Sequence, residues 1–412
     1  MPIQNTNRNT TWMLDQSNQT WTLTKNATIR VNNAEGIYEA GQSGNEIKVL
    51  GDIVVKGFNA GVRFGGSDSS VLIGQDSRII GNQTNYAIHS EGAGSDIINR
   101  GLIQAGGGHG IHGNIWNDVE NYGTIRGEIG MSFNGSGSQI YNYGLIDAHD
   151  TAISSLASGT HVENAKGAVI RSDDVGIRFY NPGMSELVNK GLLRSENVAI
   201  ADAEGQIDIT NSGTIIGKVY MGGSADSFDS RKGELKGTVF GGDGDDDYFV
   251  GQTSMKISEG DGVDSGYDQV ASKVTYKLSA NIEELTLTGT RDINATGNGG
   301  DNNIHGNNGD NKLSGLGGND FLSAQGGNDI LRGGAGFDTF AFNLTNGGVD
   351  RVTDFVDGED LVSIASIDTQ QEFDALDIKQ VNGDLVINMG SGDKIIIEDL
   401  LKSDFTYNDI YV

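Results

Sequence analysis

Short apolar runs recur along the first half of the chain at a nearly constant spacing. A degenerate Asn-x-Gly-x-Ile motif lies at Asn99–Ile103, Asn121–Ile125, Asn142–Ile146, Asn189–Leu193 and Asn211–Ile215, with a longer copy at Asn164–Ile170. Successive motif Asn residues are 22, 21, 22, 25 and 22 positions apart. Several short β-rich runs within such a period are typical of a parallel β-helix, whose coils form a continuous core only by stacking. We therefore predict a β-helix over residues 28–240, after an amino-terminal cap at residues 1–27.

The Asn and the Gly of this motif have different expected roles. Asn side chains at equivalent positions of stacked coils can form a hydrogen-bonded ladder at one corner of the solenoid. The Gly is expected to take a positive φ at the same corner.

The pattern changes near residue 222 to a shorter repeat that is rich in Gly and Asp. Five nonapeptides run without a gap from 297 to 341: GNGGDNNIH, GNNGDNKLS, GLGGNDFLS, AQGGNDILR and GGAGFDTFA. Position four is always Gly, position eight is always large and apolar, and position six is Asn302, Asn311, Asp320, Asp329 and Asp338. Gly241–Phe249 is a further copy. Two nonapeptides would make one coil, so Asp338 should stack on Asp320, and Asp329 on Asn311.

Each nonapeptide combines a Gly-rich turn with a short strand that buries its large residue. A cation between stacked turns would meet carboxylate and carbonyl oxygens, which are ligands for calcium rather than zinc. Solvated turns alone would not explain five copies in register. The candidate metal ligands are Asp246, Asn302, Gly309, Asn311, Gly318, Asp320, Gly327, Asp329, Gly336 and Asp338. The two Asn-bearing repeats carry less charge, so we expect their sites to be weaker or partly empty.

Residues 241–360 resemble the RTX family of hemolysin-type calcium-binding proteins. Glu259–Gly297 resembles the segment that often precedes RTX arrays, and Gly348–Asp360 resembles the strand pair that closes them. The resemblance implies a right-handed parallel β-roll that is disordered without calcium and is exported unfolded by type I secretion machinery. Asn at position six and the loss of Gly at position two in several repeats depart from the family pattern, which affects the number of calcium ions. The ending Asp409–Val412 is similar to the carboxy-terminal signals of type I substrates.

Composition and charge limit the classes of molecule that the chain is expected to bind. The net charge is -28, and residues 221–412 hold 34 Asp and Glu against 13 Lys and Arg. This acidity disfavours nucleic acid and anionic lipid. The chain has no Cys, so stability outside the cell would depend on metal rather than disulfides. Residues 1–12 do not resemble a Sec signal, and no apolar run is long enough to span a bilayer. We expect a secreted or cell-surface bacterial protein.

The common catalytic motifs are absent from the sequence. The chain has no H-E-x-x-H motif, no G-x-S-x-G elbow and no Cys nucleophile. Aligning the coils on the motif Ile nevertheless gives two charged columns, Arg126, Asp147, Arg171 and Arg194, and Glu128, His149, Asp173, Glu196 and Lys218. The candidate catalytic residues are Glu128, His149, Arg171, Asp173 and Glu196. The alternative is that these residues form a solvated face whose ion pairs contribute almost nothing to stability.

The sequence thus predicts an all-β chain: a right-handed parallel β-helix, an RTX calcium β-roll at 241–341, and a small carboxy-terminal β domain at 342–412 that carries the export signal. The favoured function is structural, adhesive or glycan-binding, with calcium as cofactor and extracellular polysaccharide as a candidate partner. The alternative is a polysaccharide-active enzyme, a lyase, hydrolase or epimerase, on the β-helix face.

Overall fold

Parallel β-strands dominate the computed structural model of the chain, which describes residues 2–411 except 84, 116, 181, 261–265, 344–347, 366 and 391. Strands make up 53% and helices 2% of the structure, with about 16 solenoid turns, so the all-β prediction is confirmed. The chain divides into two compact units, Met1–Phe228 with Lys232–Gly242, and Asp229–Arg231 with Asp243–Val412. In the described part of the chain, no helix is long and apolar enough to cross a membrane.

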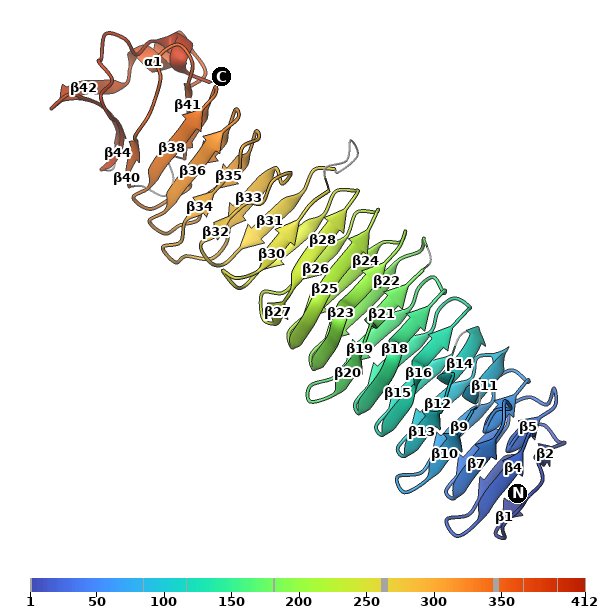
Figure 1. Cartoon of the computed structure of the whole chain (residues 1–412). Coiled ribbons are helices and arrows are strands. Elements are labelled where there is room, and N and C mark those ends of the chain that lie inside the picture. Colours follow the sequence, from blue (N-terminus) through green and yellow to red (C-terminus); the bar gives the residue numbers. More distant parts are fainter. Residues whose placement is uncertain are drawn as a thin grey trace. The chain divides into compact units, whose positions relative to one another are not determined.

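Three strand segments make up each coil of the first unit, and equivalent segments stack in parallel (Figure 1). One face consists of β3 (Thr20–Leu23), β6 (Glu46–Val49), β9 (Ser70–Ile73), β12 (Asp96–Asn99), β15 (Asp118–Asn121), β17 (Gln139–Asn142), β19 (His161–Asn164), β22 (Ser185–Asn189) and β24 (Ile207–Asn211). The other two faces contain β7 (Asp52–Lys56), β8 (Val62–Phe64), β10 (Arg78–Gly81), β11 (Tyr86–Ala93), β13 (Leu102–Ala105), β14 (His109–Ile115), β16 (Thr124–Phe133), β18 (Leu145–Ser155), β20 (Val169–Ser172), β21 (Val175–Phe179), β23 (Leu192–Asp202) and β25 (Thr214–Gly222). Alternate residues point inward, so Ile97, Val119 and Ile140 form one fully buried column.

A ladder of asparagine side chains follows the corner after the first face, as the repeated motif predicted. Nδ2 of Asn99 donates to Oδ1 of Asn121 at 2.8 Å, and Asn121 donates to Asn142 at 2.8 Å. The same contact continues through Asn164, Asn189 and Asn211. Because these amides are buried, the ladder satisfies polar groups that would otherwise destabilise the core.

The expected reason for the motif glycines is wrong. Positive φ occurs only at Gly167 of the longer motif copy, and the glycines of the five regular copies do not have it. A Cβ on Gly123 would instead lie 2.1 Å from the carbonyl oxygen of Gly101, and one on Gly144 would lie 2.2 Å from that of Gly123. Close stacking of backbones at the corner therefore requires the glycine.

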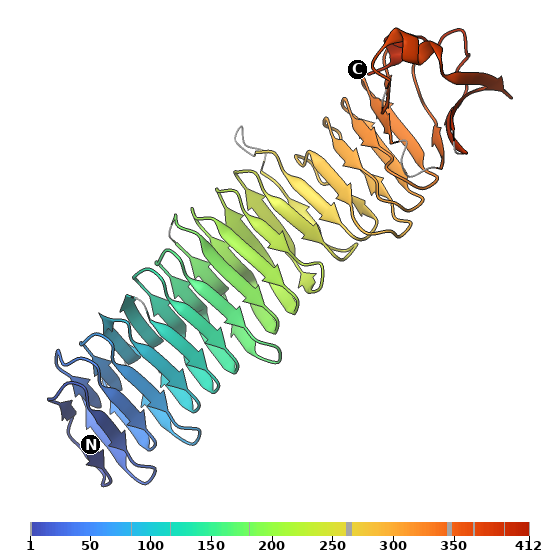
Figure 2. The same ribbon diagram turned by 180° about the vertical axis from the view of Figure 1, so that it is seen from behind.

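The second unit contains the nonapeptides, which alternate between two stacks of parallel strands (Figure 2). One stack contains β29 (Asp247–Val250), β31 (Gln269–Ser272), β33 (Glu284–Leu287), β35 (Asn303–His305), β37 (Phe321–Ser323), β39 (Thr339–Phe342) and β41 (Leu361–Ile364). The other contains β32 (Tyr276–Lys277), β34 (Ala295–Thr296), β36 (Lys312–Gly317), β38 (Ile330–Ala335), β40 (Val349–Val352) and β44 (Asp393–Ile397). Phe321 pairs with Thr339, and Lys312 pairs with Ile330, so strands 18 residues apart stack, as expected of two nonapeptides per coil.

Large residues at position eight fill the interior of this roll: Ile304, Leu313, Leu322, Leu331 and Phe340 are each at most 1% exposed. After the roll, β42 (Asp377–Val381) and β43 (Asp384–Gly390) pair antiparallel, and β43 pairs antiparallel with β44. A short helix α1 (Gln370–Asp374) and the 3₁₀ turn η1 (Tyr407–Asp409) complete this region. The expected domain boundaries themselves remain a prediction.

Candidate metal centre

Position-six side chains of alternate nonapeptides form a ladder of carboxylates next to β35, β37 and β39. Oδ1 of Asp320 accepts a hydrogen bond from the backbone N of Asn302 at 2.8 Å. Oδ1 of Asp338 accepts one from Asp320 N at 2.9 Å, and Oδ1 of Asp360 accepts one from Asp338 N at 3.0 Å. The structure therefore brings Asn302, Asp320 and Asp338 together and adds Asp360, which the sequence had not suggested as part of the site.

A second ladder follows the other strand stack. Oδ1 of Asp329 accepts from Asn311 N at 2.7 Å, and Oδ1 of Asp350 accepts from Asp329 N at 3.0 Å. Asp350 also lies outside the predicted set. Each carboxylate thus uses one oxygen to hold the turn of the coil before it.

In three of the ladder aspartates, the other carboxylate oxygen, Oδ2, is available to bind a cation. Oδ2 of Asp320, Asp329 and Asp338 is buried and has no hydrogen-bond partner among the described residues. Burial, reinforced by neighbouring carboxylates, raises the pKa of Asp320 to about 7, of Asp329 to about 8 and of Asp338 to about 6. A buried carboxylate oxygen without a donor is costly unless a cation binds it, and hard oxygen ligands suit calcium.

The two Asn-bearing repeats differ, because their amides are already satisfied. Nδ2 of Asn302 donates to the carbonyl of Ile282 at 3.0 Å, and Nδ2 of Asn311 donates to that of Ile293 at 2.6 Å. Their Oδ1 atoms accept backbone hydrogen bonds of 2.8 Å. An amide that bonds a carbonyl directly leaves less need for an ion, which favours the expectation of weaker sites at these repeats.

The position-four glycines stack at the turns of the roll. Gly336 has a φ of 132°, and a Cβ there would lie 2.1 Å from the carbonyl oxygen of Gly318. On the other stack, a Cβ on Gly327 would lie 2.5 Å from that of Gly309. These positions need glycine for the close approach of turns, while their role as carbonyl ligands remains a proposal.

A separate buried carboxylate cluster precedes the five repeats. Ligand oxygens of Asp246, Glu259 and Asp268 all lie within 4.8 Å of one another. The hydroxyl of Tyr248 donates to Glu259 and also lies 3.3 Å from Oδ2 of Asp246. Burial raises the pKa of Asp268 to about 8, and its Oδ2 has no partner among the described residues. The cluster has the same chemistry as the ladders, so we infer a calcium site here as well.

Of this cluster, only Asp246 was predicted from the sequence. Asp268 could have been found, because Asp268-Gln269-Val270 repeats the Asp-x-apolar ending of a nonapeptide, as Asp246-Asp247-Tyr248 does. Glu259 belongs to no such repeat, and it reaches the cluster from just after β30 (Lys256–Ser258).

The candidate catalytic residues of the β-helix partly meet in one pocket. A cavity of about 370 Å³ is lined by Gln104, Ala105, Gly106, Arg126, Gly127, Glu128, Asp147, Ala148, His149 and Asp173. Nδ1 of His149 lies 2.9 Å from Oδ2 of Asp173, and both side chains are mostly exposed, at 79% and 63%. Arg171 does not line the pocket, but it binds Asp147, which does, through two hydrogen bonds of 2.7 and 2.8 Å in the neighbouring column. Glu196, one coil further along, is exposed and does not line the pocket.

Comparisons with known proteins agree with the metal ladders. The family model of the RTX calcium-binding nonapeptide repeat, in four copies, matches residues 296–331 and 305–340. Residues 296–340 of the second unit are therefore RTX calcium-binding repeats within a β-solenoid, with calcium as the cofactor.

A solved structure, the extracellular lipase LipA from Serratia marcescens, is similar at 16% sequence identity and a TM-score of 0.19. The similarity covers 52% of this chain and 41% of the lipase, so the chain spans less than half of that protein. No curated protein matches the chain.

Replacing Asp338 by Asn should move the calcium midpoint of folding to higher concentration than Asn302→Ala does. Asp338 has a buried oxygen without a donor and faces Asp320, whereas the amide of Asn302 is already satisfied. Affinity in oxygen cages rises with ligand charge. Calcium titration followed by circular dichroism measures both midpoints, and an Asp338→Asn curve that overlays the unmutated protein would contradict the assignment.

Proposed function

We propose that the chain is a secreted protein whose second unit folds on calcium and whose β-helix presents a binding surface to extracellular polysaccharide. The observation that carries this proposal is the set of buried carboxylate oxygens without donors in the RTX ladders. Extracellular calcium modules commonly have dissociation constants of about 10⁻⁴–10⁻³ M. A unit of that affinity would stay unfolded inside the cell and fold after export.

The charged column of the β-helix supports the polysaccharide surface. Asp147 accepts hydrogen bonds from Arg126 on one neighbouring coil and Arg171 on the other. Next to it, His149 and Asp173 extend into solvent above an open pocket. Arginines and hydrogen-bonding groups repeated along a solenoid suit the repeated acidic and hydroxyl groups of a glycan.

The same pocket is the reason to retain a second function, a polysaccharide-active enzyme. It brings Glu128, His149 and Asp173 together, and a carboxylate next to an imidazole can act as a general acid–base pair. The two functions predict different results for the same variants.

On a binding surface, His149→Ala and Asp173→Asn should each weaken polysaccharide affinity by about fivefold or less, because exposed ion pairs contribute at most about 1 kcal/mol. The matched control is His161→Ala, whose imidazole lies 2.9 Å from Glu186 on another face. We would measure binding to a panel of acidic polysaccharides with calcium present, together with release of reducing sugar or unsaturated uronate. Product release that the two pocket variants abolish would favour the enzyme and contradict a purely binding face.

Export should require the carboxy terminus. Deleting residues 402–412 is expected to leave the protein in the cytoplasm, whereas a tag before Met1 should be tolerated. The tail also packs in the fold, since Tyr411 N donates to the carbonyl of Val362 at 3.0 Å. The truncated protein should therefore be purified and tested for calcium-dependent folding, to separate an export defect from a folding defect. Secretion of the truncated chain would refute the type I assignment.

A further inference from the structure

Three histidines and a tyrosine pack together on the outer side of β11, β14 and β16. The coil register pairs His89 with His112, and His112 with Ser132. The ring of Tyr86 stacks on that of His112 with centroids 4.7 Å apart, and it lies 4.5 Å from His89 and 5.3 Å from His109. The stacking of β11 on β14 thus brings His89 next to His109 and His112, which both lie on β14.

Two of these imidazoles converge on one point. Nδ1 of His109 lies 2.5 Å from Oγ of Ser132, and Nδ1 of His112 lies 2.7 Å from the same oxygen. A hydroxyl has one hydrogen, so it can donate to only one of the two rings. Zinc–imidazole bonds are about 2.0–2.1 Å long. An ion in place of the hydroxyl would therefore need small shifts of the two rings and a rotation of the short Ser132 side chain.

The protonation state of the cluster favours metal binding. Burial lowers the pKa of His89 and His109, and lowers that of His112 to about 4. The rings are therefore neutral at physiological pH, and neutral imidazole is the metal-binding form.

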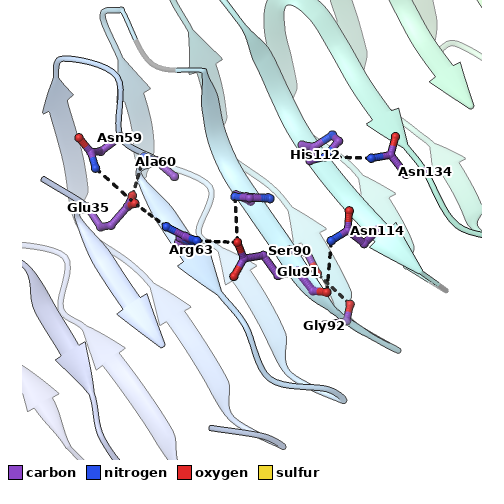
Figure 3. Close-up of polar contacts among 11 residues, drawn as sticks. Glu35, Asn59, Ala60, Arg63, Ser90, Glu91, Gly92, His112, Asn114 and Asn134 are labelled. Atoms are coloured by element: carbon purple, nitrogen blue, oxygen red, sulfur yellow. Dashed lines mark hydrogen bonds and ion pairs between the residues drawn. The ribbon is translucent and has the colours of Figure 1, made fainter. Parts of the chain in front are cut away.

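Neighbouring groups restrain the rings. Nδ2 of Asn134 lies 3.4 Å from Nε2 of His112 (Figure 3), whereas Ser132 contacts the other ring nitrogen, Nδ1. Nη2 of Arg63 holds Oε1 of Glu91 at 2.6 Å, so the carboxylate 3.9 Å from His89 is engaged by the guanidinium (Figure 3). A metal on Nδ1 of His112 leaves the ring proton on Nε2, so the Asn134 amide would turn its oxygen, rather than Nδ2, toward this ring to accept that proton's hydrogen bond.

We propose that His109 and His112, joined by His89, form a site for a borderline divalent transition metal such as Zn²⁺ on the β-helix. Imidazole ligands suit zinc, copper and nickel, whereas calcium selects oxygen ligands. The ring centroids of His89 and His112 are 5.3 Å apart, which makes His89 the candidate for a third ligand. This site lies in the first unit, in coils that contain none of the RTX nonapeptides, and the inference does not rest on the proposed function.

Calorimetric titration of the full chain with Zn²⁺ in millimolar calcium tests the site. We expect one Zn²⁺ per chain at the cluster, lost in His109→Gln and in His112→Gln. The matched controls His149→Gln and His161→Gln should retain it, and Ser132→Ala should retain it because the hydroxyl is not a ligand. Asn134→Ala should weaken the site by about tenfold, as expected for a group that orients a ligand.

A second readout separates binding from loss of fold. Circular dichroism should show the same β signal in every variant, and Co²⁺ should give visible absorption bands in the unmutated chain that both cluster variants lose. The proposal is overturned if the unmutated chain takes up no Zn²⁺, or if His109→Gln and His112→Gln bind it with unchanged affinity.

Discussion

Removal of calcium should unfold the second unit while the first unit stays folded. The roll buries Asp320, Asp329 and Asp338 with an oxygen that has no donor among the described residues, and an adjacent cluster buries three more acids. Without a cation these carboxylates must be protonated or hydrated, and binding free energy of the metal is folding free energy for such sites. Calcium at 100 times the dissociation constant of a single site already stabilises the folded state by about 2.7 kcal/mol. Several sites together therefore determine whether the second unit is folded.

Differential scanning calorimetry of the full chain would show this effect as two unfolding transitions in millimolar calcium and one in excess chelator. The transition that remains should belong to the first unit, whose core is apolar and whose corner is held by the Asn99–Asn211 ladder. Magnesium at the same concentration should not restore the lost transition, because it demands octahedral geometry and gives up water reluctantly. Two unchanged transitions in chelator would contradict calcium-dependent folding.

Acidification should have opposite effects on the calcium-free and the calcium-loaded second unit. Burial raises the pKa of five carboxyl groups above the ordinary value near 4: Asp268 and Asp329 to about 8, Asp320 to about 7, and Asp338 and Asp350 to about 6. A carboxyl group whose pKa is higher in the folded state stabilises the fold fully below its unfolded pKa, and that contribution is lost as pH rises through the folded pKa. The calcium-free unit should therefore gain stability between pH 8 and pH 5.5, by up to about 1.4 kcal/mol per pH unit for each group that titrates.

Calcium reverses this dependence, because the ion binds the ionised carboxylates and protons compete with it. We would follow β structure by circular dichroism between pH 8 and pH 5.5, with calcium-stripped and calcium-saturated protein side by side. Asp147→Asn, in the β-helix, is a control that should leave both pH profiles of the second unit unchanged. If the calcium-free unit lost β structure on acidification, the carboxylates would not be buried in the way the structure shows.

Periodic features were predictable from the sequence because stacking converts a period into contacts. The spacing of Asn99, Asn121 and Asn142 predicted a ladder, and the nine-residue period placed Asp338 on Asp320. The physical reason for a repeated contact was harder to predict from the sequence than the contact itself. Gly123 is needed for a backbone approach of 2.1 Å rather than for its φ, and only the distance between coils reveals that.

Site residues that lie outside the nine-residue repeat were not predicted, because no sequence period places them in a coil. Glu259 reaches the Asp246 cluster and Asp360 extends a ladder, but neither lies in the five contiguous nonapeptides that drew attention. His89 and His112 occupy paired positions of adjacent coils, but the coil of His89 precedes the first clear motif copy at Asn99–Ile103, so its register with His112 could not be fixed from the sequence. Once the register between coils is known, side chains at paired positions, such as His89 and His112, can be recognised as neighbours.

Hydrogen–deuterium exchange of the full chain, with and without calcium, tests the central claim most directly because it resolves the two units within one molecule. Backbone amides in residues 297–341 should be protected in millimolar calcium and exchange rapidly in chelator, while those in residues 97–215 should stay protected in both. Equal protection of residues 297–341 in the two conditions would show that the carboxylate ladders fold without calcium, and would contradict the account.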